Sequence, residues 1–307
     1  MSGIGIDVCK KHLDVAVFQG PARQFNNTAA GHCKLVRWLN TLPVKQVVLE
    51  ATGGYELAAL DALHQAALPV ARANAQRARS LANTLGRAKT DRLDAAMLAY
   101  MAEKIDLHPY VPLEPWQRRL GEYVRARQQV IELLKMAKQQ LLPVADKPLR
   151  KMLQGNIKQL VRSVARLDVL IAEQLKTLLI EHPHLAILKT LKGVGPVLLA
   201  VLMCRLPELG TLGGKQIARL VGVAPLSNDS GSVRGKRGIK GGRADIRQTL
   251  YMAAMSAARH EPRLRDFYRS LRARGKEGKV ALVAVMRKML VILNARVRDE
   301  RAAMRPA

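Results

Sequence analysis

The first third of the chain alternates between short β-branched runs and amphipathic helical stretches, and this order constrains the fold more than any other feature. Residues 3–18 form two such runs around a polar turn, which predicts a β-hairpin. A third short strand near residues 24–27 and an amphipathic helix over residues 29–42 follow. A buried strand at residues 47–49, a helix and a strand beginning at residue 69 continue the pattern. The order predicts an α/β domain with parallel strands.

Acidic residues stand at the ends of these predicted strands and at the start of a later helix. Asp7 lies among apolar neighbours in the first strand, and Glu50 ends the buried strand. Ligands of open α/β sheets gather at the carboxyl ends of strands, so Glu50 is a stronger site candidate than Asp7 by itself. Asp91 and Asp94 are spaced i, i+3, which places them on one face of a helix that begins there.

Each acid also has a plain structural explanation. A single carboxylate near a strand end is more often hydrogen-bonded within the fold, and acidic residues are common in the first turn of a helix. Four of them in one small α/β unit favour a cation site, because Mg²⁺ and Mn²⁺ prefer oxygen ligands. Such ions can activate a nucleophile and stabilise the leaving oxygen in a phosphodiester displacement.

The balance of charge indicates a polyanionic partner. Lysine and arginine total 51 against 24 aspartates and glutamates, which gives a formal net charge of +27. Nucleic acid is the leading candidate for so basic a chain. Aromatic residues are only 4% of the chain, so contacts to the phosphate backbone should carry more of the affinity than base stacking.

A membrane location and a disulfide framework are both disfavoured. The apolar run at residues 194–204 is too short to span a bilayer, and no secretory signal is visible at Met1. The three cysteines, Cys9, Cys33 and Cys204, are widely separated and lack metal-ligand spacing. These features predict a protein of a reducing cytoplasm.

Prolines at residues 109–115 mark a boundary, after which the apolar pattern becomes helical. Apolar residues recur at helical spacing over residues 120–141 and at nearly alternating steps of four and three over residues 153–178, and two prolines between these runs interrupt the pattern. This predicts an antiparallel coiled-coil spacer, whose stripes pair within one chain or with another protomer. The predicted domains are residues 1–108, 109–183 and 184–307.

Two glycine-containing segments of the C-terminal part are candidates for phosphate binding. Lys192, Gly193 and Gly195 lie in a turn between predicted helices, where N–H groups can take a DNA phosphate as in helix-hairpin-helix elements; an ordinary helix–helix turn explains them equally well. Residues 222–243 place three serines among glycines and basic residues, which suits a phosphate-handling loop, although such stretches are more often solvated loops. The basic candidates in this segment are Arg234, Lys236, Arg237, Lys240 and Arg243.

Taken together, these motifs resemble the DEDD-type insertion-sequence transposases of the IS one-ten family. That family includes bridge-RNA-guided recombinases and relatives of the Piv DNA invertase. The resemblance covers essentially the whole chain and implies a RuvC-like RNase H fold at the N-terminus and a helical transposase domain at the C-terminus. It rests on GIDV at residues 5–8, LEATGGY at 49–55, KTDRLD at 89–94, GVGP at 193–196 and the segment 225–242.

The resemblance also implies roles for individual residues. The four acids would form a metal-binding tetrad with Mg²⁺ or Mn²⁺ as cofactor, and a serine of the basic loop would be the nucleophile. Ser230 is selected because it precedes Gly231 in the family's Ser-Gly step, and Ser227 and Ser232 flank it. The expected catalytic residues are Ser230, Asp7, Glu50, Asp91 and Asp94.

These observations predict a DNA transposase or site-specific recombinase in which Ser230 attacks a DNA phosphate and strands are exchanged without net hydrolysis. The expected partners are DNA, a structured noncoding guide RNA and further copies of the chain, in a homodimer or tetramer on DNA. No membrane partner is expected, and the predicted location is a bacterial cytoplasm in association with the nucleoid. Transposition and inversion of a DNA segment both fit this chemistry.

Three alternatives remain at this stage. In a RuvC-like nuclease or Holliday junction resolvase, water attacks the phosphate and the serine loop only grips it. A sugar-kinase or actin-like ATPase also begins with a Gly-x-Asp hairpin, but its phosphate loops and second α/β half are missing from this sequence. A nucleic-acid-binding protein without catalytic activity would need no acid tetrad.

Overall fold

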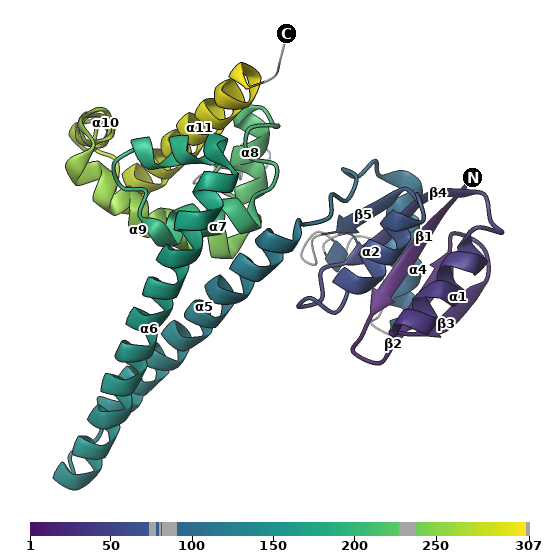
Figure 1. The fold of residues 1–307 in the computed structure, drawn as a ribbon, viewed down its shortest axis with the longest axis horizontal. Helices are drawn as coiled ribbons and strands as arrows, with labels where there is room; N and C mark the ends of the chain where they lie inside the picture. The colour runs from purple at the N-terminus through teal and green to yellow at the C-terminus, as the bar shows by residue number, and fades with distance from the viewer. Residues whose placement is uncertain (74–77, 80, 82–90, 227–237, 305–307) are drawn as a thin grey trace, which may run out of the picture. The chain divides into compact units, whose positions relative to one another are not determined.

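The computed structural model describes residues 1–73, 78–79, 81, 91–226 and 238–304, and it describes residues 91–93 by their backbone alone. The chain forms two compact units, Met1–Pro112 and Leu113–Ala307. The first unit contains a mixed sheet with helices, and the second is built from helices (Figure 1). The predicted order of an α/β domain followed by a helical remainder is confirmed.

The sheet of the first unit has the strand order β3-β2-β1-β4-β5. The central strand β1 (Ser2–Val8) pairs antiparallel with β2 (His12–Val17) and parallel with β4 (Val44–Glu50). β3 (Ala22–Asn26) and β5 (Val70–Ala73) form the two edges. Because β1 has a neighbour on each side and helices on both faces, its residues are buried almost without interruption.

Side chains alternate along β1 between two layers of helices. On one face, apolar residues pack with α1 (Ala29–Leu39) and α2 (Leu57–Gln65) in a single core. On the opposite face lies α4 (Asp91–Lys104), which has more contacts with β1 than with any other strand. A Cβ atom added to Gly5 would lie 2.1 Å from backbone atoms of α4, so only glycine permits this close approach.

Substitution of Gly5 by alanine is therefore expected to destabilise the first unit. The added carbon would meet backbone atoms rather than a flexible side chain, so the helix itself must shift, at a cost of about 1–3 kcal/mol or more. Gly121→Ala is the matched control, because a Cβ at that helical position has no neighbour within 4 Å. Thermal unfolding should show a lower melting temperature for Gly5→Ala alone. Equal melting temperatures for the two variants would contradict this account of the packing.

The second unit begins with a hairpin of two long helices. α5 (Pro115–Leu141) and α6 (Lys147–Glu181) run antiparallel and contact each other (Figure 1). Only the ends next to the other helices contribute buried apolar side chains, which are Leu120 on α5 and Ile171, Leu175 and Leu178 on α6. The two expected helices are present, and the coiled-coil character of their pairing stays a prediction.

The hairpin shares one hydrophobic core with the rest of this unit. At its centre is α7 (Pro196–Arg205), in which every residue from Leu198 to Cys204 is buried. The apolar run that was too short for a membrane span is thus a core helix, and no helix of the described residues is long and apolar enough to cross a membrane. The surrounding elements are η1 (Pro183–Thr190), α8 (Gly214–Val221), α9 (Ala244–His260), α10 (Pro262–Ala273) and α11 (Gly278–Ala303).

Candidate functional site

Two of the predicted acids stand next to each other at one edge of the sheet. The parallel register pairs Gly5 of β1 with Val48 of β4. Both lie on the face that α4 covers, since Gly5 meets the helix backbone and Val48 belongs to the core formed with α4. Asp7 and Glu50 are each two residues further along their strands, so they share this face and the carboxyl edge.

The first turn of α4 lies toward the same edge. Gly3 of β1 lies against Glu103 of α4, and Gly5 lies against Ala95. The helix therefore runs antiparallel to the strand. Asp94 immediately precedes Ala95, and Asp91 is the first residue of the helix. The side chain of Asp91 lies outside the described residues. The backbone of α4 therefore brings the first turn of the helix to the end of β1.

The described side chains alone do not form a metal centre. Among them, no three histidine, cysteine, aspartate or glutamate side chains are grouped closely enough to hold an ion. The described side chains include those of Asp7, Glu50 and Asp94 but not that of Asp91. The tetrad therefore remains a prediction, in which the register juxtaposes the two strand acids and the helical pair would complete the ligand set.

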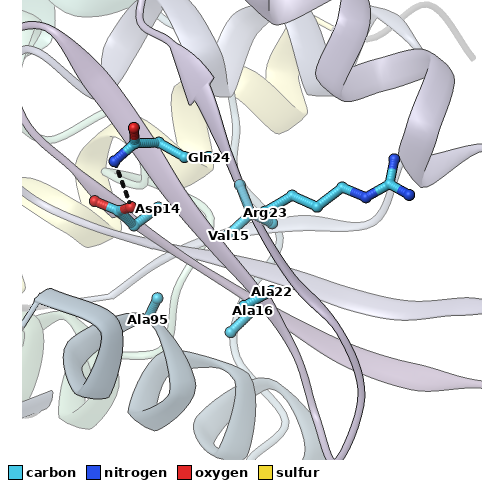
Figure 2. Close-up of a pocket in the computed structure, with 7 residues that line it drawn as sticks. All are labelled: Asp14, Val15, Ala16, Ala22, Arg23, Gln24 and Ala95. Carbon is cyan, nitrogen blue, oxygen red and sulfur yellow. Dashed lines mark hydrogen bonds between the residues drawn. The ribbon is translucent and has the colours of Figure 1, made fainter.

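A fifth carboxylate, Asp14, lies beside this edge and was not predicted. It is the register partner of Asp7 on β2, and directly paired residues of antiparallel strands point to the same face. Asp14 and Ala95 line a cavity of about 230 Å³, and Gln24 Nε2 donates to Asp14 Oδ1 at 2.9 Å. Figure 2 shows these residues and the hydrogen bond. His12 Nε2 lies 3.4 Å from the other carboxylate oxygen. These contacts give Asp14 a structural role, and only the strand register, which sequence reasoning did not determine, reveals its position.

The turn that follows Glu50 is held by a fully buried glutamate. Glu56 is 0% exposed, and its Oε2 accepts hydrogen bonds from the N–H groups of Thr52 at 3.1 Å and Gly54 at 2.9 Å. Its other oxygen is paired with the guanidinium of Arg72 on β5. Gly54 has a φ of 109°, which favours glycine. Glu56 thus fixes the backbone path by which the chain leaves Glu50.

Asn27 connects the two segments that leave the acid-bearing strands. Its Nδ2 donates to the carbonyl of Cys9, after β1, at 2.9 Å and to the carbonyl of Tyr55, after β4, at 3.2 Å. Its Oδ1 accepts from Nε2 of His32 at 2.8 Å. Burial lowers the pKa of His32, which favours the neutral imidazole. One side chain therefore fixes the position of the Asp7 segment against that of the Glu50 turn.

Glu56→Ala is expected to lower the free energy of unfolding by about 3 kcal/mol. The substitution leaves the N–H groups of Thr52 and Gly54 without their acceptor. Because Arg72 is partly exposed and can be solvated, the loss of stability should be at the lower end of the range for breaking a buried ion pair. Glu132→Ala is the control, since Glu132 forms an exposed pair with Lys135 and should change stability by less than about 0.5 kcal/mol. Urea denaturation of both variants measures the difference. A cost below that of the control would contradict the role assigned to Glu56.

The segment that carries the three serines, residues 227–237, lies outside the described residues, but both of its ends are described. Leu226 N–H donates to the carbonyl of Gly238 at 2.9 Å in an antiparallel bridge. Below it, Gly222 and Gly242 are in such close contact that a Cβ on Gly242 would lie 2.3 Å from Gly222 N. The two ends are thus joined at a tight base. The predicted residues in the undescribed segment are Ser230, Arg234, Lys236 and Arg237.

Arg243, one of the predicted phosphate ligands, is engaged within the fold. Its Nη1 donates to Glu208 Oε2 at 2.7 Å and to the carbonyl of Arg205 at 2.8 Å, and its Nη2 donates to Glu208 Oε1 at 2.5 Å. This bidentate pair fixes the guanidinium at the base of the serine loop. Arg243 thus has partners within the fold next to the serine loop, whereas Lys240 is exposed.

The predicted glycine turn precedes α7 and follows a 3₁₀ helix. Gly193 has a φ of 103°, and a Cβ there would lie 2.8 Å from Cβ of Ala257 and 2.9 Å from the carbonyl of Ala253. Close packing on α9 therefore explains this glycine. Gly195 is the exposed N-cap residue of α7, and Lys192, three residues earlier in the chain, is also exposed. The helix-hairpin-helix likeness of this turn stays a prediction.

Both parts of the chain match models of transposase families. Residues 4–147 match a model described as transposase, and residues 185–269 match one described as the transposase IS116/IS110/IS902 family. The pilin gene-inverting protein of Moraxella bovis is 27% identical over 97% of this chain and 96% of its own length. An uncharacterized 43.6 kDa protein of insertion element IS110 from Streptomyces coelicolor is 31% identical over 41% of this chain and 32% of its own length.

Proposed function

This chain belongs to the IS110 family of transposases and is a DNA transposase or recombinase, and from this premise we propose that it cuts and rejoins DNA through a serine nucleophile assisted by divalent metal ions. The observation that carries the proposal is the juxtaposition of Asp7 and Glu50 at the carboxyl edge of the sheet, beside the first turn of α4. This edge is where ligands of α/β sheets gather. The mixed sheet also supports the proposal of a RuvC-like RNase H fold.

The proposed ligand set consists of the two strand acids with Asp91 and Asp94. Carboxylate oxygens suit Mg²⁺ or Mn²⁺, which when bound stabilise charge on the attacking and leaving oxygens of a phosphodiester. The chain's own contribution is to hold the carboxylates in place. Strand register aligns the first two, and Glu56 and Asn27 fix the backbone after them. Like charges gathered in this way favour a bound cation.

The proposed nucleophile is Ser230. Its Oγ forms a bond to phosphorus while the bond from phosphorus to a deoxyribose oxygen breaks, and the serine proton passes to the leaving oxygen through solvent. The product is a serine–DNA phosphodiester, so the bond energy is retained and attack by another strand's hydroxyl rejoins DNA without net hydrolysis. The bridge between Leu226 and Gly238 and the Glu208–Arg243 pair support this role, because they hold the two ends from which the serine segment extends.

The proposed partners are DNA and a structured noncoding guide RNA. The net charge of +27 supports contacts with nucleic-acid phosphates. Exposed basic residues on α10 and the turn after it supply one surface of this kind, and Lys192 and Lys240 are exposed as well. The residues on and after α10 are Arg263, Arg269, Arg272, Arg274 and Lys276.

Site-specific DNA inversion is the second candidate function, with the same chemistry. The similarity to the pilin gene-inverting protein over 97% of the chain favours it. A plasmid assay separates the two outcomes: the gene's own flanking sequences are cloned around a marker, and junctions are sequenced after expression of the protein. Excised or newly inserted segments indicate transposition, and a reversed marker indicates inversion. Linear products with unjoined ends would contradict both and favour a nuclease.

The helical hairpin supports a homodimer or tetramer. Between Leu120 on α5 and Ile171 on α6, no apolar side chain of the hairpin is buried. The pairing of two helices leaves the apolar residues of this part only half-buried or exposed, and a second copy of the hairpin would cover more of them in a four-helix arrangement. The exposed apolar residues of the hairpin are Leu133, Met136, Leu142, Leu149, Met152, Val161 and Val169.

We expect the serine of one protomer to act with the acids of another. Because the acids and the serine loop belong to different compact units, a mixture of Ser230→Ala and Asp7→Ala proteins, each inactive alone, should recover part of the wild-type adduct formation on DNA. The mixture needs differently tagged proteins, so that co-purification demonstrates mixed oligomers. If mixed oligomers form and the adduct stays absent, each chain must build its own site.

A further inference from the structure

Tyr55 differs from the other aromatic residues of the chain in the exposure of its side chain. The chain has 3 Phe, 6 Tyr and 2 Trp, all within the described residues, and Tyr55 alone among them is an exposed side chain, at 50%. The other ten are packed against a core or against another ring. They are Phe18, Phe25, Trp38, Tyr100, Tyr110, Trp116, Tyr123, Tyr251, Phe267 and Tyr268.

Hydrogen bonds hold the backbone that carries this ring. Tyr55 lies in the turn after Glu50, and its N–H donates to the carbonyl of Thr52 at 3.3 Å. Its own carbonyl accepts from Asn27, and the preceding residue, Gly54, donates to the buried carboxylate of Glu56. An exposed side chain on a freely moving loop would need no such contacts. The turn instead presents a half-exposed ring from a rigid base at the edge where Asp7 and Glu50 meet.

We propose that the ring of Tyr55 stacks on an unpaired nucleobase of the DNA strand that enters the acid edge. This inference rests on the proposed function, because strand exchange separates paired bases and leaves them free to stack. Every base has a π-face, so such a contact tolerates any sequence. The basic residues supply the sequence-independent attraction to phosphates, while Tyr55 holds one base and so sets which phosphate lies beside the carboxylates.

The test uses binding and photocrosslinking, without DNA cleavage. An oligothymidylate carrying one 5-iodouracil is bound to the full-length Ser230→Ala protein and to the same protein with Tyr55→Phe or Tyr55→Leu. Near-ultraviolet light joins iodouracil to a stacked aromatic ring, and peptide mass spectrometry locates the link. Crosslinks at residue 55 are expected with tyrosine and with phenylalanine. Tyr55→Leu should lose them and bind the single strand about tenfold more weakly, with affinity for a duplex of the same length unchanged.

Unchanged single-strand affinity of Tyr55→Leu, or crosslinks confined to other residues, would overturn the inference. An equal loss for duplex and single strand would also overturn it, since Tyr55 would then act on phosphate contacts or on contacts between protein chains. Melting temperatures verify that the variants fold, and if Tyr55→Leu fails to fold, the crosslink position in the tyrosine protein decides. No step of this experiment depends on a serine nucleophile. A negative stacking result therefore does not contradict the proposed function, and the stacking result can be interpreted even if the protein does not rejoin DNA.

Discussion

Asp7→Asn and Glu50→Gln are each expected to slow formation of the protein–DNA link by about 10²–10³-fold or more. Each amide keeps the shape of the carboxylate but loses its negative charge, which a divalent ion needs in its ligand set. The two residues share one face and one edge of the sheet through the register of β1 with β4. Calorimetric titration with Mn²⁺ gives a second readout, in which both variants should bind the ion more weakly than the wild-type protein.

Asp14→Asn is the matched control for these variants. Asp14 is the register partner of Asp7 on the other neighbouring strand, but Gln24 and His12 already account for its carboxylate. Its replacement should leave the rate of link formation within a few-fold of the wild-type value. A loss as large as that of Asp7→Asn would mean that general negative charge at this edge, rather than specific ligands, supports the reaction.

Ser230→Ala is expected to reduce DNA rejoining by about 10⁴–10⁶-fold, the scale on which removal of a nucleophile acts in a serine enzyme. In the proposed mechanism the Oγ of Ser230 forms the bond to phosphorus, so alanine removes the reacting atom, whereas binding to DNA should persist because it depends on the basic residues. Ser227→Ala and Ser232→Ala are the controls within the same loop. If Ser230→Ala keeps full activity and one of the controls loses it, the serine replaced in that control is the nucleophile. Full activity of all three variants would exclude a nucleophile among these serines.

Local sequence patterns predicted the elements that carry the acids. β-branched alternation predicted the hairpin of β1 and β2, and the buried run ending in Glu50 predicted β4. The acidic pair predicted the start of α4 at Asp91. These features depend on residues close in sequence, which is why they could be recognised without a structure.

The supports around the acids could not be predicted, because they depend on contacts between distant segments. Asp14 becomes relevant only through its pairing with Asp7, and Asn27 only through carbonyls from two other segments. The bidentate contact of Arg243 with Glu208 likewise joins residues far apart in sequence. A basic residue in a glycine-rich loop suggests phosphate binding, whereas its partner within the fold appears only once the helices have packed.

The central claim, that a serine rather than water attacks the DNA phosphate, is tested most directly by following oxygen from the solvent during DNA cleavage. Wild-type protein is incubated with DNA carrying its own flanking sequences in water enriched in ¹⁸O and quenched in denaturant. The products are transferred to ordinary water, digested with nuclease and protease, and analysed by mass spectrometry. The account predicts a peptide containing Ser230 with a nucleotide attached through a phosphodiester, and rejoined DNA without ¹⁸O. Free DNA ends carrying ¹⁸O in the terminal phosphate, with no modified peptide, would show that water is the nucleophile and would contradict the serine mechanism.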